Sequence, residues 1–156
     1  MVCGGNMKES EKRYRLYEYI KANDEITENL SNTKKLILKL MKNDKQTEDY
    51  CNRKMLEEKG EVEDAIIGKH YHENMTKRAI LVNEISQYIY WQTVLAVGKG
   101  MSYDEFKEEE KIEELLKRVD ITKIGEVKPI TVNEVISHDI EQMSKKDYLK
   151  KVIEEW

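Results

Sequence analysis

The amino-acid sequence predicts an all-α protein, a helical bundle built around an antiparallel hairpin of two long helices. Of the 156 residues 37% are charged and only one is proline, a composition that suits long helices. Apolar residues recur at steps of three and four along most of the chain, which is the spacing of one helix face. There is little sign of strands. At this length the chain can form one domain with a real core.

Two helices are expected in the first part of the chain, over residues 10–21 and 27–41. Ser10 opens the first of them. The second also offers apolar residues for packing, and a polar stretch at 43–45 separates it from the next helix. The residues of the first helix that we expect to face inward are Tyr14, Tyr17 and Ile20.

The two long central helices are expected over residues 47–67 and 75–97. Thr47 can cap the first, with acids in its first turn, and Gly68 follows its end. The second is apolar almost all round over its later half, so we expect it to be the most buried element. A pair of glycines ends it. The two helices are therefore expected to lie antiparallel, as a hairpin.

A further helix is expected after the glycine turn. Ser102 and Glu105 form a capping-box pattern, and apolar spacing continues to about Val119. Beyond that point the pattern changes to that of a linker or extended segment, and Pro129 stops any helix from passing through it. The bundle is therefore expected to end near residue 120.

The C-terminal part carries two more capping patterns, which begin at Thr131 and at Ser144. Each precedes a short apolar run that can form a helix. We therefore divide the chain into a bundle over residues 1–120 and a C-terminal helical extension over 121–156. The extension is expected to pack on the bundle or on a partner subunit.

Charge and cysteine content argue against several classes of protein. The net charge of −4 and the isoelectric point near 5.6 argue against a general nucleic-acid binder. No long apolar run predicts a membrane span. Cys3 and Cys51 form neither a disulfide framework nor a zinc spacing, and the first residues lack the apolar segment of a secretory signal. We expect a soluble, cytoplasmic protein with no membrane contact.

Two carboxylates stand where helix periodicity requires apolar residues. Glu58 occurs within an apolar stripe of one central helix, and Glu84 within a stripe of the other. Glu61 and Gln87 each follow by one turn on the same face, so four oxygen-bearing side chains can converge if the helices pack together. The stripes consist of Cys51, Met55, Glu58, Val62 and Ala65, and of Leu81, Glu84, Tyr88, Trp91 and Leu95.

Such a cluster needs a partner, because removing ionised carboxylates from water is costly unless a cation or hydrogen-bond donors compensate. A hard divalent ion would fill that role. Oxygen ligands suit Mg²⁺ or Mn²⁺, and Mg²⁺ binds few carboxylates together with substrate phosphates. The implied substrate is a phosphate ester or anhydride.

The same acids also have a purely structural interpretation, since pairs of Glu three residues apart arise often by chance in so charged a chain. Glu105 and Glu108 show this spacing and share a phase with Ile112. We expect that pair in the first turn of a helix, where the dipole alone favours acids. A helical interaction protein, whose Glu residues face solvent or a partner subunit, is therefore an alternative function.

The residues around the acids resemble a known family. Three stretches carry the resemblance, and together they span residues 53 to 106, about a third of the chain. They are similar to the all-α nucleotide pyrophosphohydrolases related to MazG and phosphoribosyl-ATP pyrophosphohydrolase. The stretches are Arg-Lys-Met-Leu-Glu-Glu-Lys-Gly-Glu-Val at 53–62, Asn-Glu-Ile-Ser-Gln-Tyr-Ile-Tyr at 83–90 and Gly-Met-Ser-Tyr-Asp-Glu-Phe at 100–106.

The resemblance implies a MazG-like bundle and a Mg²⁺-dependent reaction. A nucleoside triphosphate, or a nucleotide like phosphoribosyl-ATP, would be hydrolysed to the monophosphate and pyrophosphate. Glu58, Glu61 and Glu84 match the metal-binding acids of the family. Gln87 stands where the family usually has Asp; it keeps a carbonyl oxygen for coordination but cannot act as a carboxylate base. A catalytically weak or inactive relative that binds nucleotide or metal is the second alternative.

Other residues have expected roles beside the metal ligands. One of the three acids, or Glu57, would orient or deprotonate the attacking water. Lys54 matches a basic residue of the family and can reach a phosphate. Tyr88 and Trp91 can stack on the base, or they belong to the core. The family commonly forms oligomers, so we also expect a homodimer or homotetramer.

Overall fold

The protein is helical throughout the part that the computed structural model describes. The described residues are 7–22, 44–67, 69, 74–120, 122, 125, 128–143, 151 and 154. They contain no strand, so the predicted all-α class is confirmed. Among them, no helix has the length and apolar character needed to cross a membrane. The helices expected over 27–41 and from Ser144 lie outside the described residues.

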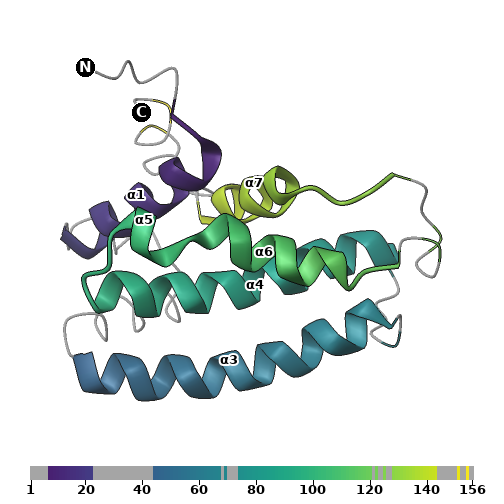
Figure 1. Cartoon of the computed structure of the whole chain (residues 1–156), viewed down its shortest axis with the longest axis horizontal. Helices are drawn as coiled ribbons and strands as arrows, with labels where there is room; N and C mark the ends of the chain where they lie inside the picture. The colour runs from purple at the N-terminus through teal and green to yellow at the C-terminus, as the bar shows by residue number, and fades with distance from the viewer. Residues whose placement is uncertain are drawn as a thin grey trace.

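Two long helices dominate the structure (Figure 1). α3, Asp44–Ile66, and α4, Lys77–Gly98, lie side by side and run in opposite directions. Thr76 caps α4 by accepting a hydrogen bond from the Ala79 amide, and the chain turns after α4 at Gly100, whose φ is +76°. These features fix where α4 begins and ends.

α3 begins earlier than the sequence indicated. The polar stretch at 43–45 was expected to be a separator, with Thr47 as the cap, yet the helix already starts at Asp44. Both expectations were wrong. Lys45 and Gln46 are exposed and are good helix formers, so nothing in their chemistry prevents the helix from extending over them.

α4 lies between α3 and the remaining helices (Figure 1). It contacts α1, Glu9–Ala22, as well as α6, Glu108–Lys117, and α7, Val132–Met143. It has no charged residue after Glu84 and is the most extensively buried of the described helices, as its composition predicted. α7 starts at the capping box of Thr131 and Glu134 and buries Val135 and Ile136 against the bundle.

The helix expected from Ser102 to Val119 is broken in two. The capping box of Ser102 and Glu105 starts α5, Tyr103–Phe106, as predicted, but Lys107 adopts a left-handed conformation with φ +52° and ends it. α6 begins directly afterwards. The break has a packing reason: residues two apart in one helix point in nearly opposite directions, whereas here Phe106 and Glu108 are both buried.

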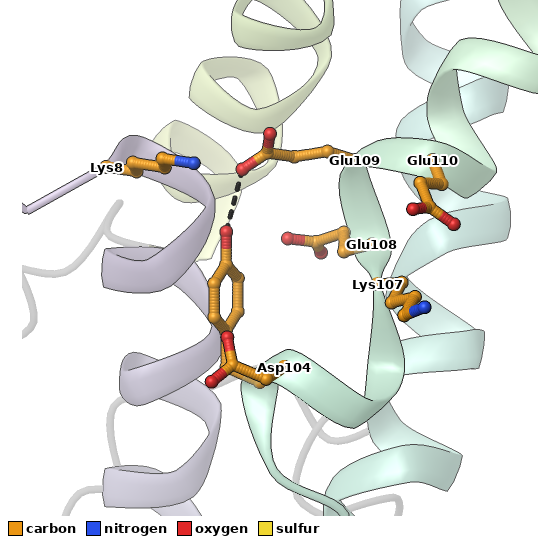
Figure 2. Close-up of a pocket in the computed structure, with 7 residues that line it drawn as sticks. Lys8, Asp104, Lys107, Glu108, Glu109 and Glu110 are labelled. Atoms are coloured by element: carbon orange, nitrogen blue, oxygen red, sulfur yellow. Dashed lines mark hydrogen bonds between the residues drawn. The ribbon is translucent and has the colours of Figure 1, made fainter.

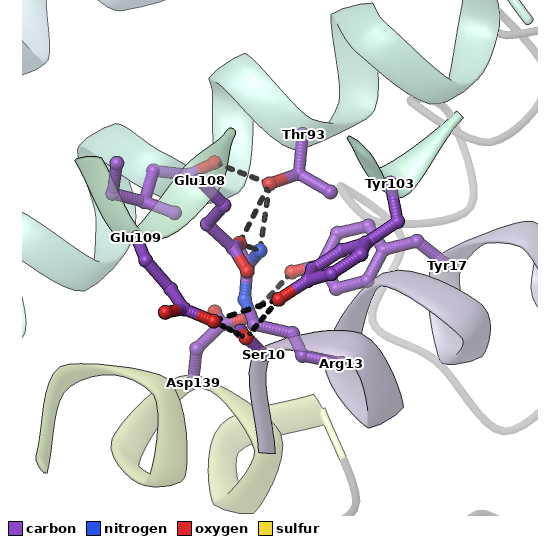
Figure 3. Close-up of polar contacts among 9 residues, drawn as sticks. Ser10, Arg13, Tyr17, Thr93, Tyr103, Glu108, Glu109 and Asp139 are labelled. Atoms are coloured by element: carbon purple, nitrogen blue, oxygen red, sulfur yellow. Dashed lines mark hydrogen bonds and ion pairs between the residues drawn. The ribbon is translucent and has the colours of Figure 1, made fainter. Parts of the chain in front are cut away.

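A buried polar network ties four helices together (Figure 3). Arg13 of α1 is fully buried and donates from Nε to Asp139 Oδ2 of α7 at 2.6 Å, and from Nη1 to Thr93 Oγ1 of α4 at 2.6 Å and to Glu108 of α6. Tyr17 donates to the same Asp139 oxygen at 2.6 Å. Glu108 thus lies in the first turn of a helix, as expected, and is in addition an interior ion-pair partner of Arg13.

Candidate metal centre

The acids of α3 and α4 interrupt the apolar core. The buried residues form two apolar clusters, one containing Cys51 and Trp91 and the other containing Val62 and Leu81. Along α3, Glu58 lies between Cys51 of the first cluster and Val62 of the second, whereas Glu84 lies among the α4 residues of the second cluster. Glu84 is 4% exposed, as its position in the stripe predicted, and Glu58 is half-buried. The acids thus form a polar seam within an otherwise apolar interface.

Three carboxylates meet in this seam. One oxygen from each of Glu58, Glu61 and Glu84 lies within 4.8 Å of the other two. Oxygens that bind one octahedral Mg²⁺ at 2.0–2.1 Å lie about 2.9 Å apart when they are neighbours and about 4.2 Å apart when they are opposite, so separations of up to 4.8 Å would have to close by about 0.6–1.9 Å. Rotation of the flexible Glu side chains supplies a movement of that size. The three acids therefore fit a hard divalent cation in both chemistry and spacing.

The electrostatics of the seam favour the uptake of positive charge. Burial, together with the charge of Glu61 and a hydrogen bond to it, raises the pKa of Glu58 to about 7. Burial, a hydrogen bond to Glu61 and its charge raise the pKa of Glu84 to about 8. A hydrogen bond between two carboxyl groups needs a shared proton, so protons reduce the negative charge of the cluster. A metal ion would replace them.

Glu58 provides a further sign that the seam suits a cation. Its Oε2 atom is buried and has no hydrogen-bond partner among the described residues. A buried carboxylate oxygen without a partner is costly, and proteins normally avoid it. Lys54, one turn earlier on α3, lowers the pKa of Glu58 only as a secondary influence. The Glu58 oxygen can therefore bind a ligand atom or an ion.

Two candidate residues lie outside the three-acid cluster. Glu57 is exposed, with 65% of its side chain accessible, and pairs with the Nζ atom of Lys54 at 3.4 Å. Gln87 is on α4, one turn after Glu84, and is also exposed. Either side chain would have to turn inward to touch an ion held by the three acids.

The remaining candidates lie beside the cluster. The Nζ atom of Lys54 is 5.8 Å from the ring centroid of Tyr50 and 6.0 Å from that of Trp91. Trp91 is 6% exposed and packs against Tyr90, so it is a core residue that presents little surface for stacking. Tyr88 is partly buried against the apolar cluster around Val62.

A second group of acids behaves differently (Figure 2). Glu108, Glu109, Asp104 and Glu110 line a hollow of about 170 Å³ together with Lys8 and Lys107. Glu109 accepts hydrogen bonds from Ser10 at 2.5 Å and from Tyr103 at 2.7 Å, which lower its pKa. Glu108 is paired with Arg13. Because these two acids already have donors, the hollow is a poorer cation site than the seam.

Sequence reasoning missed Gln92. Its Oε1 atom is buried without a hydrogen-bond partner among the described residues, and the side chain lines a cavity beyond the acids. The available signal was a large polar residue within the Tyr88–Val97 half of α4, which is otherwise almost entirely apolar. Thr93, the neighbouring polar residue, is satisfied by the Ile89 carbonyl and by Arg13.

The structure places the predicted site residues as follows. Glu58, Glu61 and Glu84 come together, Lys54 lies one turn from Glu58, and Gln87 is exposed one turn after Glu84. Comparison of the whole chain with protein-family models, curated proteins and solved structures found no match.

Proposed function

We propose that the protein is a Mg²⁺-dependent nucleotide pyrophosphohydrolase, with Mn²⁺ as a substitute metal. It would hydrolyse a nucleoside triphosphate, or a nucleotide like phosphoribosyl-ATP, to the monophosphate and pyrophosphate. The observation that carries the proposal is the convergence of Glu58, Glu61 and Glu84 in a half-buried seam. Oxygen ligands of this kind bind Mg²⁺, which in turn binds phosphates.

The three acids would hold the ion, and the ion would supply charge neutralisation for the phosphates and a more acidic bound water. Lys54 is placed to contact a phosphate, because its flexible side chain lies one turn from Glu58 and is only partly exposed. Proton removal from the attacking water belongs to one of the clustered acids or to Glu57. Glu84 is well shielded from solvent, which strengthens any electrostatic interaction it makes.

The proposal is tested by metal binding and pyrophosphate release. Mn²⁺ binding is measured by electron paramagnetic resonance, and pyrophosphate release is measured with a panel of nucleoside triphosphates and phosphoribosyl-ATP. Glu84→Gln and Glu61→Gln should weaken metal binding and abolish release. Glu114→Gln, an exposed acid of α6 away from the seam, is the matched control and should behave like the wild type. Equal Mn²⁺ binding by all four proteins would reject the site.

We also propose that the chain forms a homo-oligomer, a dimer or tetramer, through the outer face of α3. Leu56 is 73% exposed and Ile67 is 54% exposed. Ile67 directly follows α3 and its amide still bonds to the Glu63 carbonyl, and residues eleven apart lie on the same side of a helix, so both side chains face the same way. Exposed apolar side chains of this size are enriched at protein interfaces.

Sedimentation velocity tests the oligomer. The wild type should sediment as a dimer or larger species at micromolar concentration, and Leu56→Glu should shift it to monomer. Ser137→Glu, at an exposed position of α7, is the control and should leave the association unchanged. A monomeric wild type would refute the proposed interface without affecting the proposed chemistry.

A further inference from the structure

A separate cavity lies beside the C-terminal half of α4. Its volume is about 200 Å³, and it lies between α3, α4 and the α5–α6 segment. Pockets that enclose whole drug-sized ligands measure about 300–1,000 Å³. This one therefore suits a single ring system with the rest of the ligand outside. Its walls are mostly apolar and include Met55, Leu95, Ala96, Met101 and Phe106.

Three polar residues line the cavity, namely Gln92, Lys99 and Lys111. Gln92 contributes a buried Oε1 acceptor that has no partner among the described residues. Lys99 and Lys111 contribute ammonium donors, and the Nζ atom of Lys111 lies 5.5 Å from the ring centroid of Phe106. The Gln92 amide carries both a donor and an acceptor, and a purely apolar occupant would pair with neither. The occupant should therefore carry an N–H donor as well as acceptors.

We propose that this cavity binds the nucleobase of the nucleotide, with Gln92 as its hydrogen-bond partner, an inference that rests on the function proposed above. Every nucleobase is a flat ring with an amino or imino N–H at its edge, which can donate to Gln92. Ring nitrogens and carbonyl oxygens can accept from the two lysines. The faces of the ring suit the Met and Phe walls.

The position of the cavity relative to the acids supports this assignment. Met55 lines the cavity and lies one helical turn before Glu58 on α3. On α4, Gln92 follows Glu84 by eight residues, which corresponds to about 12 Å along the helix. That separation is comparable to the length of a nucleoside diphosphate. A base at Gln92 thus leaves the phosphates free to extend toward Glu58 and Glu84.

Calorimetric binding tests the inference without turnover. The probes are the α,β-methylene triphosphates of adenosine, guanosine, cytidine and uridine with Mg²⁺, and inorganic tripolyphosphate as the probe without a base. At least one nucleoside probe should bind about tenfold or more tightly than tripolyphosphate. Gln92→Met should weaken the tightest of these by about 3- to 10-fold, the value of one neutral hydrogen bond, and leave tripolyphosphate binding unchanged.

The control variants distinguish a loss of ligand binding in the cavity from a loss of folding. Asn133→Leu removes an exposed amide on α7 and should leave every affinity unchanged. Gln92→Ala is a second variant at the same position and should weaken the same probe, and circular dichroism checks that each variant is folded. Nucleoside probes that bind no more tightly than tripolyphosphate would overturn the inference. Unchanged affinities in both folded Gln92 variants would also overturn it.

The two proposals fail in different ways. If Glu84→Gln abolishes pyrophosphate release while the Gln92 variants keep wild-type affinity for every probe, the cavity assignment is wrong and the proposed reaction stands. If the wild type releases no pyrophosphate but the nucleoside probes bind in a manner that depends on Gln92, the reaction is wrong and the base-binding cavity stands.

Discussion

At the scale of single residues, Glu84 has the largest consequences. Glu84 is almost completely buried. Burial, together with the two carboxylates beside it, raises its pKa to about 8. In the unfolded chain the same group titrates near 4.5. Between pH 4.5 and about pH 8, Glu84 is protonated in the native protein and ionised in the unfolded chain. The metal-free protein is thus destabilised by its own candidate site as the pH rises.

The first prediction concerns this pH dependence. In the presence of a chelator, the free energy of unfolding should fall as the pH rises from about 5 to 8, because the unfolded state binds fewer protons in that window. The contribution of Glu84 to the slope is at most about 1.4 kcal/mol per pH unit. Urea unfolding followed by circular dichroism measures it.

Variants and metal check the origin of the slope. Glu84→Gln should reduce the slope to the part that Glu58 contributes through its own raised pKa, and should be more stable than the wild type at pH 8 without metal. The lowered pKa values of Glu109 and Glu134 act below this window, so they do not mask the effect. A slope that is identical in wild type and Glu84→Gln would show that the group does not titrate as described.

The second prediction concerns Gln87. Gln87→Asp restores a carboxylate one turn after Glu84, at an exposed position where the substitution has little effect on packing. Metal binding should tighten, and pyrophosphate release should rise or appear, because a charged ligand binds Mg²⁺ better than an amide oxygen. Mn²⁺ titration and the release assay measure both effects. Weaker Mn²⁺ binding by Gln87→Asp would place residue 87 outside the site.

At the scale of elements, the break between α5 and α6 shows how packing overrides local pattern. The capping box at Ser102 predicted where the segment starts, but the spacing of later apolar residues predicted one helix to Val119. Lys107 interrupts it in a left-handed conformation, which is unfavourable for a residue with a Cβ atom. Packing offsets this conformational cost, because Phe106 is buried in the core and Glu108 forms an ion pair with Arg13.

The third prediction follows from this strain. Lys107→Gly should raise the free energy of unfolding by about 0.5–1 kcal/mol, because glycine adopts positive φ without the steric cost. Lys117→Gly, in the last turn of α6, is the matched control and should lower it by a similar amount. Thermal and urea unfolding measure both. Equal destabilisation by the two substitutions would mean that Lys107 does not adopt the left-handed conformation in solution.

At the scale of the whole molecule, Arg13 joins helices that are far apart in sequence. Its partners Glu108 and Asp139 lie 95 and 126 residues away. Sequence periodicity predicted the helices around residues 10–21, 75–97 and after Thr131, and it predicted the inward position of Glu84. It did not predict this network, although Arg13 shares a helix face with Tyr17 and Ile20, because a pattern along one helix does not reveal a partner on another.

The fourth prediction tests the network. Arg13→Met should lower the free energy of unfolding by about 3–5 kcal/mol, because two carboxylates would remain buried without their cation. Arg15→Met removes the exposed pair with Glu11 on the same helix and should cost less than about 1 kcal/mol. Urea unfolding compares the two variants. A loss below 1 kcal/mol for Arg13→Met would show that water replaces the guanidinium at little cost.

The acidic seam between α3 and α4 has a consequence for how α3 is held. Among the described helices α3 makes its main contacts with α4, and the acids lie within that interface. At a pH high enough to ionise all three acids, and without a cation, their mutual repulsion opposes the apolar attraction between the two helices. An ion bound by the three acids would therefore stabilise the packing of α3 against α4. Metal binding should then slow amide hydrogen exchange along both helices.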